Sequence, residues 1–123
     1  MKLKNVLIVV DDMERAKAFY RELFGLSVIL DGEERVILTE GLVLQEKRVW
    51  EEAVGGKVTA RSLGGELYFE EPDLEGFVGR LEGYREPVEF VNRLREDFQG
   101  QKMIRFYDLD GNLIEVRSPV GVF

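Results

Sequence analysis

The feature that most constrains the fold of this sequence is an internal repeat. The segment Asn5–Asp12 aligns without gaps on Glu66–Asp73, and in both segments an apolar stretch runs into an acidic residue that suits the start of a helix. Gly41–Gln45 lines up in the same way with Gly111–Glu115. A chain that repeats these signals in each half is expected to fold as two copies of one supersecondary unit.

Each half contains one amphipathic helix pattern. The first pattern follows Asp12 and ends at Gly25, and the second follows Asp73 and ends at Gly83. Apolar residues at helical spacing should bury one face of each helix; they are Ala16, Phe19, Tyr20, Leu23 and Phe24 in the first and Leu74, Phe77, Val78 and Leu81 in the second. A further short helix is predicted at 48–54.

Three extended stretches follow each helix pattern. They lie at 27–30, 35–39 and 42–46 in the first half and at 88–91, 102–107 and 113–117 in the second. The sequence therefore predicts an α+β fold in which two βαβββ units form a curved, cup-like mixed sheet with the helices on its outer face. We expect one domain over 1–123, with unit one at about 1–46, a linker at 47–63 and unit two at about 64–117.

Composition narrows the classes of function. The chain has 123 residues, of which 45% are hydrophobic and 33% charged, which is typical of one globular domain. It has no cysteine and no histidine, so thiolate chemistry, imidazole bases and imidazole metal ligands are excluded. The net charge of −7 argues against a nucleic-acid partner. The first apolar stretch is too short for a membrane span or a signal peptide, so we expect a cytoplasmic protein without a membrane partner.

Period-two alternation divides each strand between a face that the helix covers and an opposite, open face. Four polar residues, Asn5, Gln45, Glu66 and Glu115, fall at repeat-related positions on the open face. Curled sheets would bring these side chains together. Solvent contact alone also places polar residues on an uncovered sheet face, and this simpler interpretation stays open.

Three segments carry a resemblance to a known family: Val9–Tyr20 (VVDDMERAKAFY), Leu23–Leu26 (LFGL) and Arg105–Val116 (RFYDLDGNLIEV). The chain resembles the vicinal oxygen chelate superfamily, which includes glyoxalase I, bleomycin-resistance proteins, fosfomycin-resistance enzymes and extradiol dioxygenases. The resemblance spans nearly the whole chain. It implies the βαβββ fold predicted above and a small-molecule ligand.

The resemblance also implies a set of site residues. The family's metal ligands map onto Asn5, Gln45, Glu66 and Glu115, although histidine is usual at the places of Asn5 and Glu66. The oxygen donors that remain suit a hard cation such as Mn²⁺ or Mg²⁺. With such a metal the protein would be a lyase or isomerase of the glyoxalase type, and Glu66 or Glu115 would move the proton.

The alternative is a metal-free protein that sequesters a cationic ligand, as bleomycin-resistance proteins do. A third alternative is a structural or regulatory member of the fold without either activity, so whether the protein is an enzyme stays open. We expect a homodimer, because the edges of a curved sheet need covering. Five residues are candidates to line the ligand pocket, although aromatic residues near strands are more often core: Trp50, Tyr68, Phe98, Arg105 and Tyr107.

Overall fold

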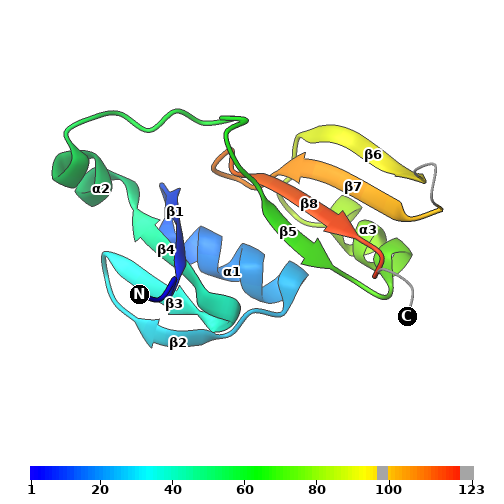
Figure 1. Ribbon diagram of the computed structural model, residues 1–123, viewed down its shortest axis with the longest axis horizontal. Helices are drawn as coiled ribbons and strands as arrows, with labels where there is room; N and C mark the ends of the chain where they lie inside the picture. The colour runs from blue at the N-terminus through cyan, green and yellow to red at the C-terminus, as the bar shows by residue number, and fades with distance from the viewer. Residues whose placement is uncertain (97–99, 120–123) are drawn as a thin grey trace. The chain divides into compact units, whose positions relative to one another are not determined.

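A computed structural model describes residues 1–96 and 100–119 of the chain, and it divides into two compact units. The first unit is Met1–Thr59 and the second begins at Ala60. Each unit has a four-stranded sheet. Figure 1 shows a helix lying along the sheet in each unit. The predicted α+β class and the two βαβββ units are confirmed.

The first unit contains four strands and two helices. Its elements are β1 (Val6–Val10), α1 (Met13–Phe24), β2 (Val28–Asp31), β3 (Arg35–Leu38), the 3₁₀ turn η1 (Thr39–Gly41), β4 (Leu42–Glu46) and α2 (Lys47–Val54). The sheet has the strand order β1-β4-β3-β2, in which β1 and β4 are parallel and the other pairs antiparallel. The mixed sheet follows because α1 separates β1 from the other strands along the chain.

The second unit repeats this plan with one helix. Its elements are β5 (Leu67–Glu70), α3 (Leu74–Glu82), β6 (Phe90–Glu96), β7 (Lys102–Tyr107) and β8 (Leu113–Arg117), and its sheet has the order β5-β8-β7-β6. Strands β5 and β8 are parallel, and β8, β7 and β6 pair antiparallel. Within the described residues, no helix is long and apolar enough to cross a membrane.

The predicted caps and buried faces of α1 and α3 are confirmed. The Asp12 carboxylate accepts from the Arg15 N–H at 3.1 Å, and the Asp73 carboxylate accepts from the Gly76 N–H at 3.0 Å. Gly25 ends α1 with a φ of 68°, a left-handed conformation that glycine adopts without strain. Most residues expected on the buried face of each helix are buried, with Phe19 at 1% and Phe77 at 2% exposed, whereas Phe24 and Val78 are half-buried.

One strand was predicted in the wrong place. The sequence indicated 88–91, whereas β6 spans Phe90–Glu96. Its pairing with β7 is interrupted between Phe90 and Asn92 and again between Asn92 and Arg95. These irregularities and the polar residues of an exposed edge strand hide the period-two alternation on which the prediction depended.

The strand register also corrects the ungapped alignment of the repeat. In the first unit Leu7 lies opposite Val43, and in the second unit Tyr68 lies opposite Glu115. Matching Gly41–Gln45 to Gly111–Glu115 makes Val43 the counterpart of Leu113, two residues before Glu115. Because Glu66 is likewise two residues before Tyr68, the counterpart of Glu66 is Leu7 and not Asn5. The ungapped alignment matched the two helix starts correctly. Relative to its parallel partner β8, however, β5 is shifted by two residues compared with β1 on β4, and a shift of two leaves each side chain on the same face of the sheet.

Candidate functional site

A cluster of charged and polar side chains lies on the open face of the second sheet, the face that α3 does not cover. Three strands supply it, because Tyr68 on β5 and Arg105 on β7 both lie opposite Glu115 on β8. Glu66 immediately precedes β5 and points to the same face, since it is two residues before Tyr68. The register therefore brings together Glu66, Tyr68, Arg105 and Glu115 within one unit.

Glu115 is the centre of this cluster. Its side chain is 3% exposed, and both of its carboxylate oxygens accept from arginines. Arg105 Nη2 lies 2.6 Å from Oε1, and Arg117 Nε lies 2.5 Å from Oε2. Charge-assisted bonds of this kind are the strong ones in a protein interior, so Glu115 and the two guanidinium groups form one fixed unit.

Each arginine has further polar contacts that hold it in place. Arg117 Nη1 donates to Gln101 Oε1 at 3.0 Å, and its Nη2 lies 3.3 Å from Met103 Sδ. Arg105 Nη1 lies 3.4 Å from Asn92 Oδ1. Both guanidinium planes are thus fixed at more than one nitrogen, which limits their freedom to turn toward a ligand.

Glu66 is held more loosely than Glu115. Its carboxylate lies 3.6 Å from Arg105 Nε, and its side chain is 30% exposed. The neighbouring Tyr68 is 52% exposed. Glu66 and Tyr68 are therefore the members of the cluster that a ligand can reach most easily.

The pKa values of the two carboxyl groups are shifted in opposite directions. Burial raises the pKa of Glu66, and the charge of Glu115 and a hydrogen bond with it raise that pKa further, against the opposing charge of Arg105. Burial also raises the pKa of Glu115, but the hydrogen bond from Arg117 and the charges of Arg105 and Arg117 outweigh burial and lower the pKa overall. Glu115 is therefore the anion and Glu66 the group that holds the proton first as pH falls.

The remaining predicted metal ligands, Asn5 and Gln45, belong to the first unit. Gln45 on β4 is 3% exposed, and both ends of its amide are bonded: Oε1 accepts from Arg35 Nε at 2.8 Å and Nε2 donates to the Glu34 carbonyl at 3.0 Å. Asn5 lies just before β1 and donates from Nδ2 to the Gly41 carbonyl at 3.2 Å. These two amides are thus engaged in holding their own sheet together.

The residues predicted to line a pocket are spread over both units. Trp50 lies on α2 in the first unit and is half-buried. Tyr107 on β7 is 9% exposed, and the Arg61 guanidinium lies 5.9 Å from its ring centre. Phe98 lies outside the described residues. Of the predicted set, Tyr68 and Arg105 lie in the cluster around Glu115.

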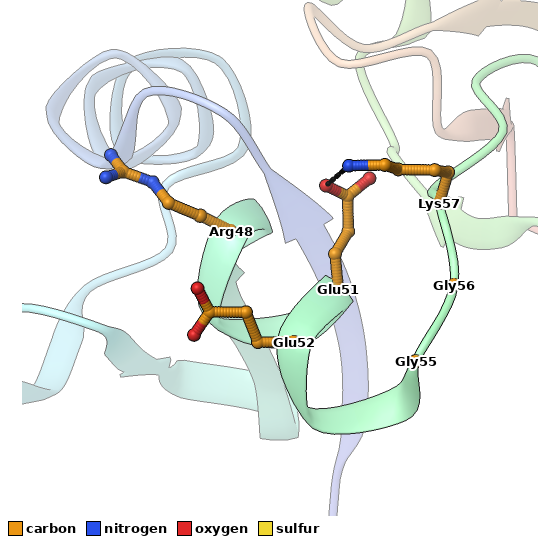
Figure 2. A pocket seen from close by; sticks show the side chains of 6 residues that line it. All are labelled: Arg48, Glu51, Glu52, Gly55, Gly56 and Lys57. Carbon is orange, nitrogen blue, oxygen red and sulfur yellow. Dashed lines mark ion pairs between the residues drawn. The ribbon is translucent and has the colours of Figure 1, made fainter.

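A hollow of about 360 Å³ lies beside α2 in the first unit, and Figure 2 shows the side chains that line it. Glu51 and Lys57 meet on one side, with 3.7 Å between Oε1 and Nζ, and the other Glu51 oxygen accepts from the Val58 N–H at 2.8 Å. No aromatic residue contributes to the lining, so this hollow differs from the aromatic-walled pocket that the sequence predicted.

The cluster of the second unit does not suit a divalent cation. A metal at Glu115 would have to displace Arg105 and Arg117 from its oxygens, because each oxygen already has a guanidinium nitrogen within 2.6 Å. Within residues 1–96 and 100–119, no three acidic side chains gather closely enough to hold a metal ion. The four-residue metal site stays a prediction, since its donors come from two separate units.

Sequence reasoning missed Arg35 and left Arg117 without a specific role. Arg35 faces Gln45 across β3 and β4 just as Arg105 faces Glu115 across β7 and β8. Both pairs are separated by ten residues in the chain. A comparison of the third strands of the repeat would have shown this signal, because an arginine stands at the same place in each.

Comparison with known proteins matches residues 3–121 to the family described as glyoxalase-like domain. A search of functionally curated proteins found no match. Among solved structures, a protein of unknown function from Agrobacterium tumefaciens str. C58 is 30% identical, with a TM-score of 0.83 and coverage of 98% of this chain and 95% of that one.

Two more distant structures share the fold. Lactoylglutathione lyase from Agrobacterium tumefaciens is 24% identical, with a TM-score of 0.71 and coverage of 95% of this chain and 92% of that one. The fosfomycin resistance protein FosX from Listeria monocytogenes is 18% identical, with a TM-score of 0.76 and coverage of 98% and 94%. At these identities the likeness concerns the fold.

Proposed function

Since the chain belongs to the glyoxalase-like domain family of the vicinal oxygen chelate superfamily, we propose that it binds a small molecule without the help of a metal. The observation that carries this proposal is the pairing of both Glu115 oxygens with arginines. In this arrangement the two guanidinium groups supply the positive charge that a metal would otherwise bring to this carboxylate. The metal-dependent lyase or isomerase of the glyoxalase type is the second candidate, and the response of the protein to 9-aminoacridine and to Mn²⁺ or Mg²⁺ separates it from metal-free sequestration.

The chemistry of the exposed part of the cluster favours a planar cation as ligand. Glu66 offers a carboxylate whose nearest guanidinium nitrogen is 3.6 Å away, so a ligand cation can add a closer contact. Tyr68, 52% exposed, offers an aromatic face for a cationic ring system. In this proposal Glu66 and Tyr68 contact the ligand, and Glu115 positions Arg105 beside them.

The test compares two classes of added ligand on the purified protein. The planar cation 9-aminoacridine should bind saturably in a fluorescence titration, and Glu66→Gln should weaken that binding about tenfold or more by removing a charged partner. Glu52→Gln, on the exposed surface of α2, is the matched control and should bind like the wild type. Equal affinity of the Glu66→Gln variant and the wild type would remove Glu66 from the site.

The second class of ligand tests the metal alternative. If Asn5, Gln45, Glu66 and Glu115 hold a metal, Mn²⁺ or Mg²⁺ should stabilise the protein by about 2.7 kcal/mol at 100 times its Kd. Glu115→Gln should then weaken the response by removing a charged ligand. Under our proposal neither cation raises the melting temperature of the wild type, and a rise that Glu115→Gln abolishes would overturn it.

We also expect the protein to act as a homodimer. The edge strand β2 exposes consecutive apolar side chains, with Val28 at 41%, Ile29 at 65% and Leu30 at 60%. An open strand edge with apolar side chains favours association, and a second copy of the chain would cover it. Light scattering at micromolar concentration should give twice the 14.2 kDa mass of the chain, and a monomer mass alone would contradict the expectation.

A further inference from the structure

The first sheet carries an arginine whose charge is not neutralised. Arg35 on β3 is exposed, and its Nε donates to the neutral amide oxygen of Gln45 at 2.8 Å. Within residues 1–96 and 100–119, no carboxylate forms an ion pair with Arg35. Its two terminal nitrogens therefore keep their donors available to a ligand.

Gln45 fixes the direction in which this arginine points. The Gln45 side chain is 3% exposed, and its Nε2 donates to the Glu34 carbonyl at 3.0 Å. Because the amide is bonded at both ends, it cannot rotate without losing a buried hydrogen bond. The Arg35 guanidinium is thus held at Nε in one plane, which lowers the entropic cost of binding a ligand at its terminal nitrogens.

The second unit shows what an arginine at this position binds. Arg105 occupies the equivalent place on β7, and its Nη2 lies 2.6 Å from a carboxylate oxygen of Glu115. In the first unit Gln45 stands where Glu115 stands in the second. With an amide in place of a carboxylate, Arg35 lacks the anionic partner that Arg105 has.

Apolar side chains lie next to Arg35 on the same face. Leu7, Val43 and Ile37 form a row across β1, β4 and β3, two residues along each strand from the row that holds Gln45 and Arg35. Val43 is 4% exposed, whereas Leu7 and Ile37 are half-buried. A ligand that joins a planar oxyanion to an apolar body would match a guanidinium beside such a row.

We propose that the open face of the first sheet binds the carboxylate or phosphate group of a small molecule through Arg35, with the apolar row beside it favouring an aromatic carboxylate. This inference goes beyond the proposed function, since it concerns the other sheet, a ligand group of opposite charge and none of the residues Glu66, Tyr68 or Glu115. The chain's net charge of −7 gives anions no general attraction, so saturable binding must come from a local cation.

The probes are sodium benzoate and inorganic phosphate, each compared with sodium chloride at equal ionic strength. The Arg35 Nε–Hε resonance should shift saturably with benzoate and phosphate, and benzoate should bind more tightly because of its ring. Arg35→Gln should weaken benzoate binding about tenfold or more, since it removes a charged donor. Arg48→Gln, which changes an exposed arginine of the same unit, should leave the affinity unchanged.

Two further variants separate the charge of Arg35 from its geometry. Gln45→Glu keeps Arg35 but gives it a carboxylate, as in the second unit, and should abolish benzoate binding. Arg35→Lys keeps the charge and loses the planar fork, so its affinity should fall between those of the wild type and Arg35→Gln. Wild-type affinity in Arg35→Gln, or a response that chloride reproduces, would overturn the inference. Loss of 9-aminoacridine binding by Glu66→Gln reports on the proposed function alone.

Discussion

The open faces of the two sheets place an arginine at the same position and differ in its partner. In the first sheet Arg35 donates to the amide of Gln45, and in the second Arg105 and Arg117 both bind the carboxylate of Glu115. One face therefore carries an uncompensated guanidinium, and the other a group of charges that balance one another. Two units with one backbone plan thus offer different chemistry, and the change from an amide to a carboxylate on the last strand is the difference that decides the partner of the arginine.

The helix-covered faces of the two units, by contrast, both bury a phenylalanine of the helix, and this shared feature sets a reference for the comparison. Phe19 on α1 is 1% exposed and Phe77 on α3 is 2% exposed, although they lie at different distances from the capping aspartates Asp12 and Asp73. We expect Phe19→Ala and Phe77→Ala each to lower the free energy of unfolding by about 3–5 kcal/mol, because each leaves a large cavity. Urea denaturation measures both, and Val54→Ala at an exposed position should change it by less than about 0.5 kcal/mol. A small loss in one phenylalanine variant would mean that the two cores are not equivalent.

Replacing Glu115 on β8 or Gln45 on β4 by methionine should lower the free energy of unfolding by different amounts. Glu115→Met leaves two arginines without their carboxylate and should lower the free energy of unfolding by about 3 kcal/mol, the lower end for a broken buried pair, since Arg105 stays 29% and Arg117 17% exposed. Gln45→Met removes the hydrogen bonds of Gln45 with the Glu34 carbonyl and with Arg35. Because water can reach both of these partners, the free energy of unfolding should fall by only about 1 kcal/mol.

Urea denaturation of the two methionine variants under the same conditions measures this difference. Equal losses would contradict the comparison, because they would mean that the charge of Glu115 adds nothing beyond an ordinary hydrogen-bond acceptor. A third variant, Glu115→Gln, carries over the amide of the first sheet and should lie between the other two. Its single amide oxygen can accept from one arginine well but cannot balance two positive charges.

The sequence predicted the secondary structure of both units well for reasons that are local. Acidic caps, helical spacing under α1 and α3, and glycine at the turns are signals that neighbouring residues carry, and the structure confirms the elements they indicate. Gly111 illustrates the strength of such a signal: its φ is 83°, and an added Cβ would lie 2.7 Å from the Ala60 Cβ. A glycine is required there both by conformation and by space.

The partners of the polar residues were harder to predict, because they depend on strand register. The helix caps aligned Asn5 with Glu66, whereas pairing across the sheets makes Leu7 the counterpart of Glu66. The prediction that Glu115 faces a site did not show that Arg105 and Arg117 would occupy both of its oxygens. Such contacts form between strands far apart in sequence, and no local pattern specifies them.

The smallest expected effect is the pH dependence that Glu66 adds to the stability of the folded protein. It sharpens the comparison of the two sheets, because the first sheet has Leu7, which does not titrate, at the equivalent place. Burial and the charge of Glu115 raise the pKa of Glu66 in the folded protein above its ordinary value of 4.5. A raised folded pKa means that the folded state binds the proton more tightly than the unfolded state does. The stability from this group is therefore fully present below pH 4.5 and is lost as pH rises through the folded pKa.

Glu66→Gln should remove this dependence, since an amide does not titrate. The variant should gain stability relative to the wild type as pH rises above 4.5, and the difference should level off once Glu66 is ionised.

Glu115 contributes with the opposite sign, because its folded pKa is lowered: the stability that it adds is present above pH 4.5 and is lost as pH falls through the folded pKa. Urea denaturation of the wild type and of Glu66→Gln from about pH 3 to pH 8 separates the two contributions, because the Glu66 effect lies above pH 4.5 and the Glu115 effect below it, with Glu52→Gln as a control on an exposed carboxylate. A constant difference between Glu66→Gln and the wild type across this range would show that Glu66 does not titrate under the influence of Glu115, and the two carboxyl groups would then act independently.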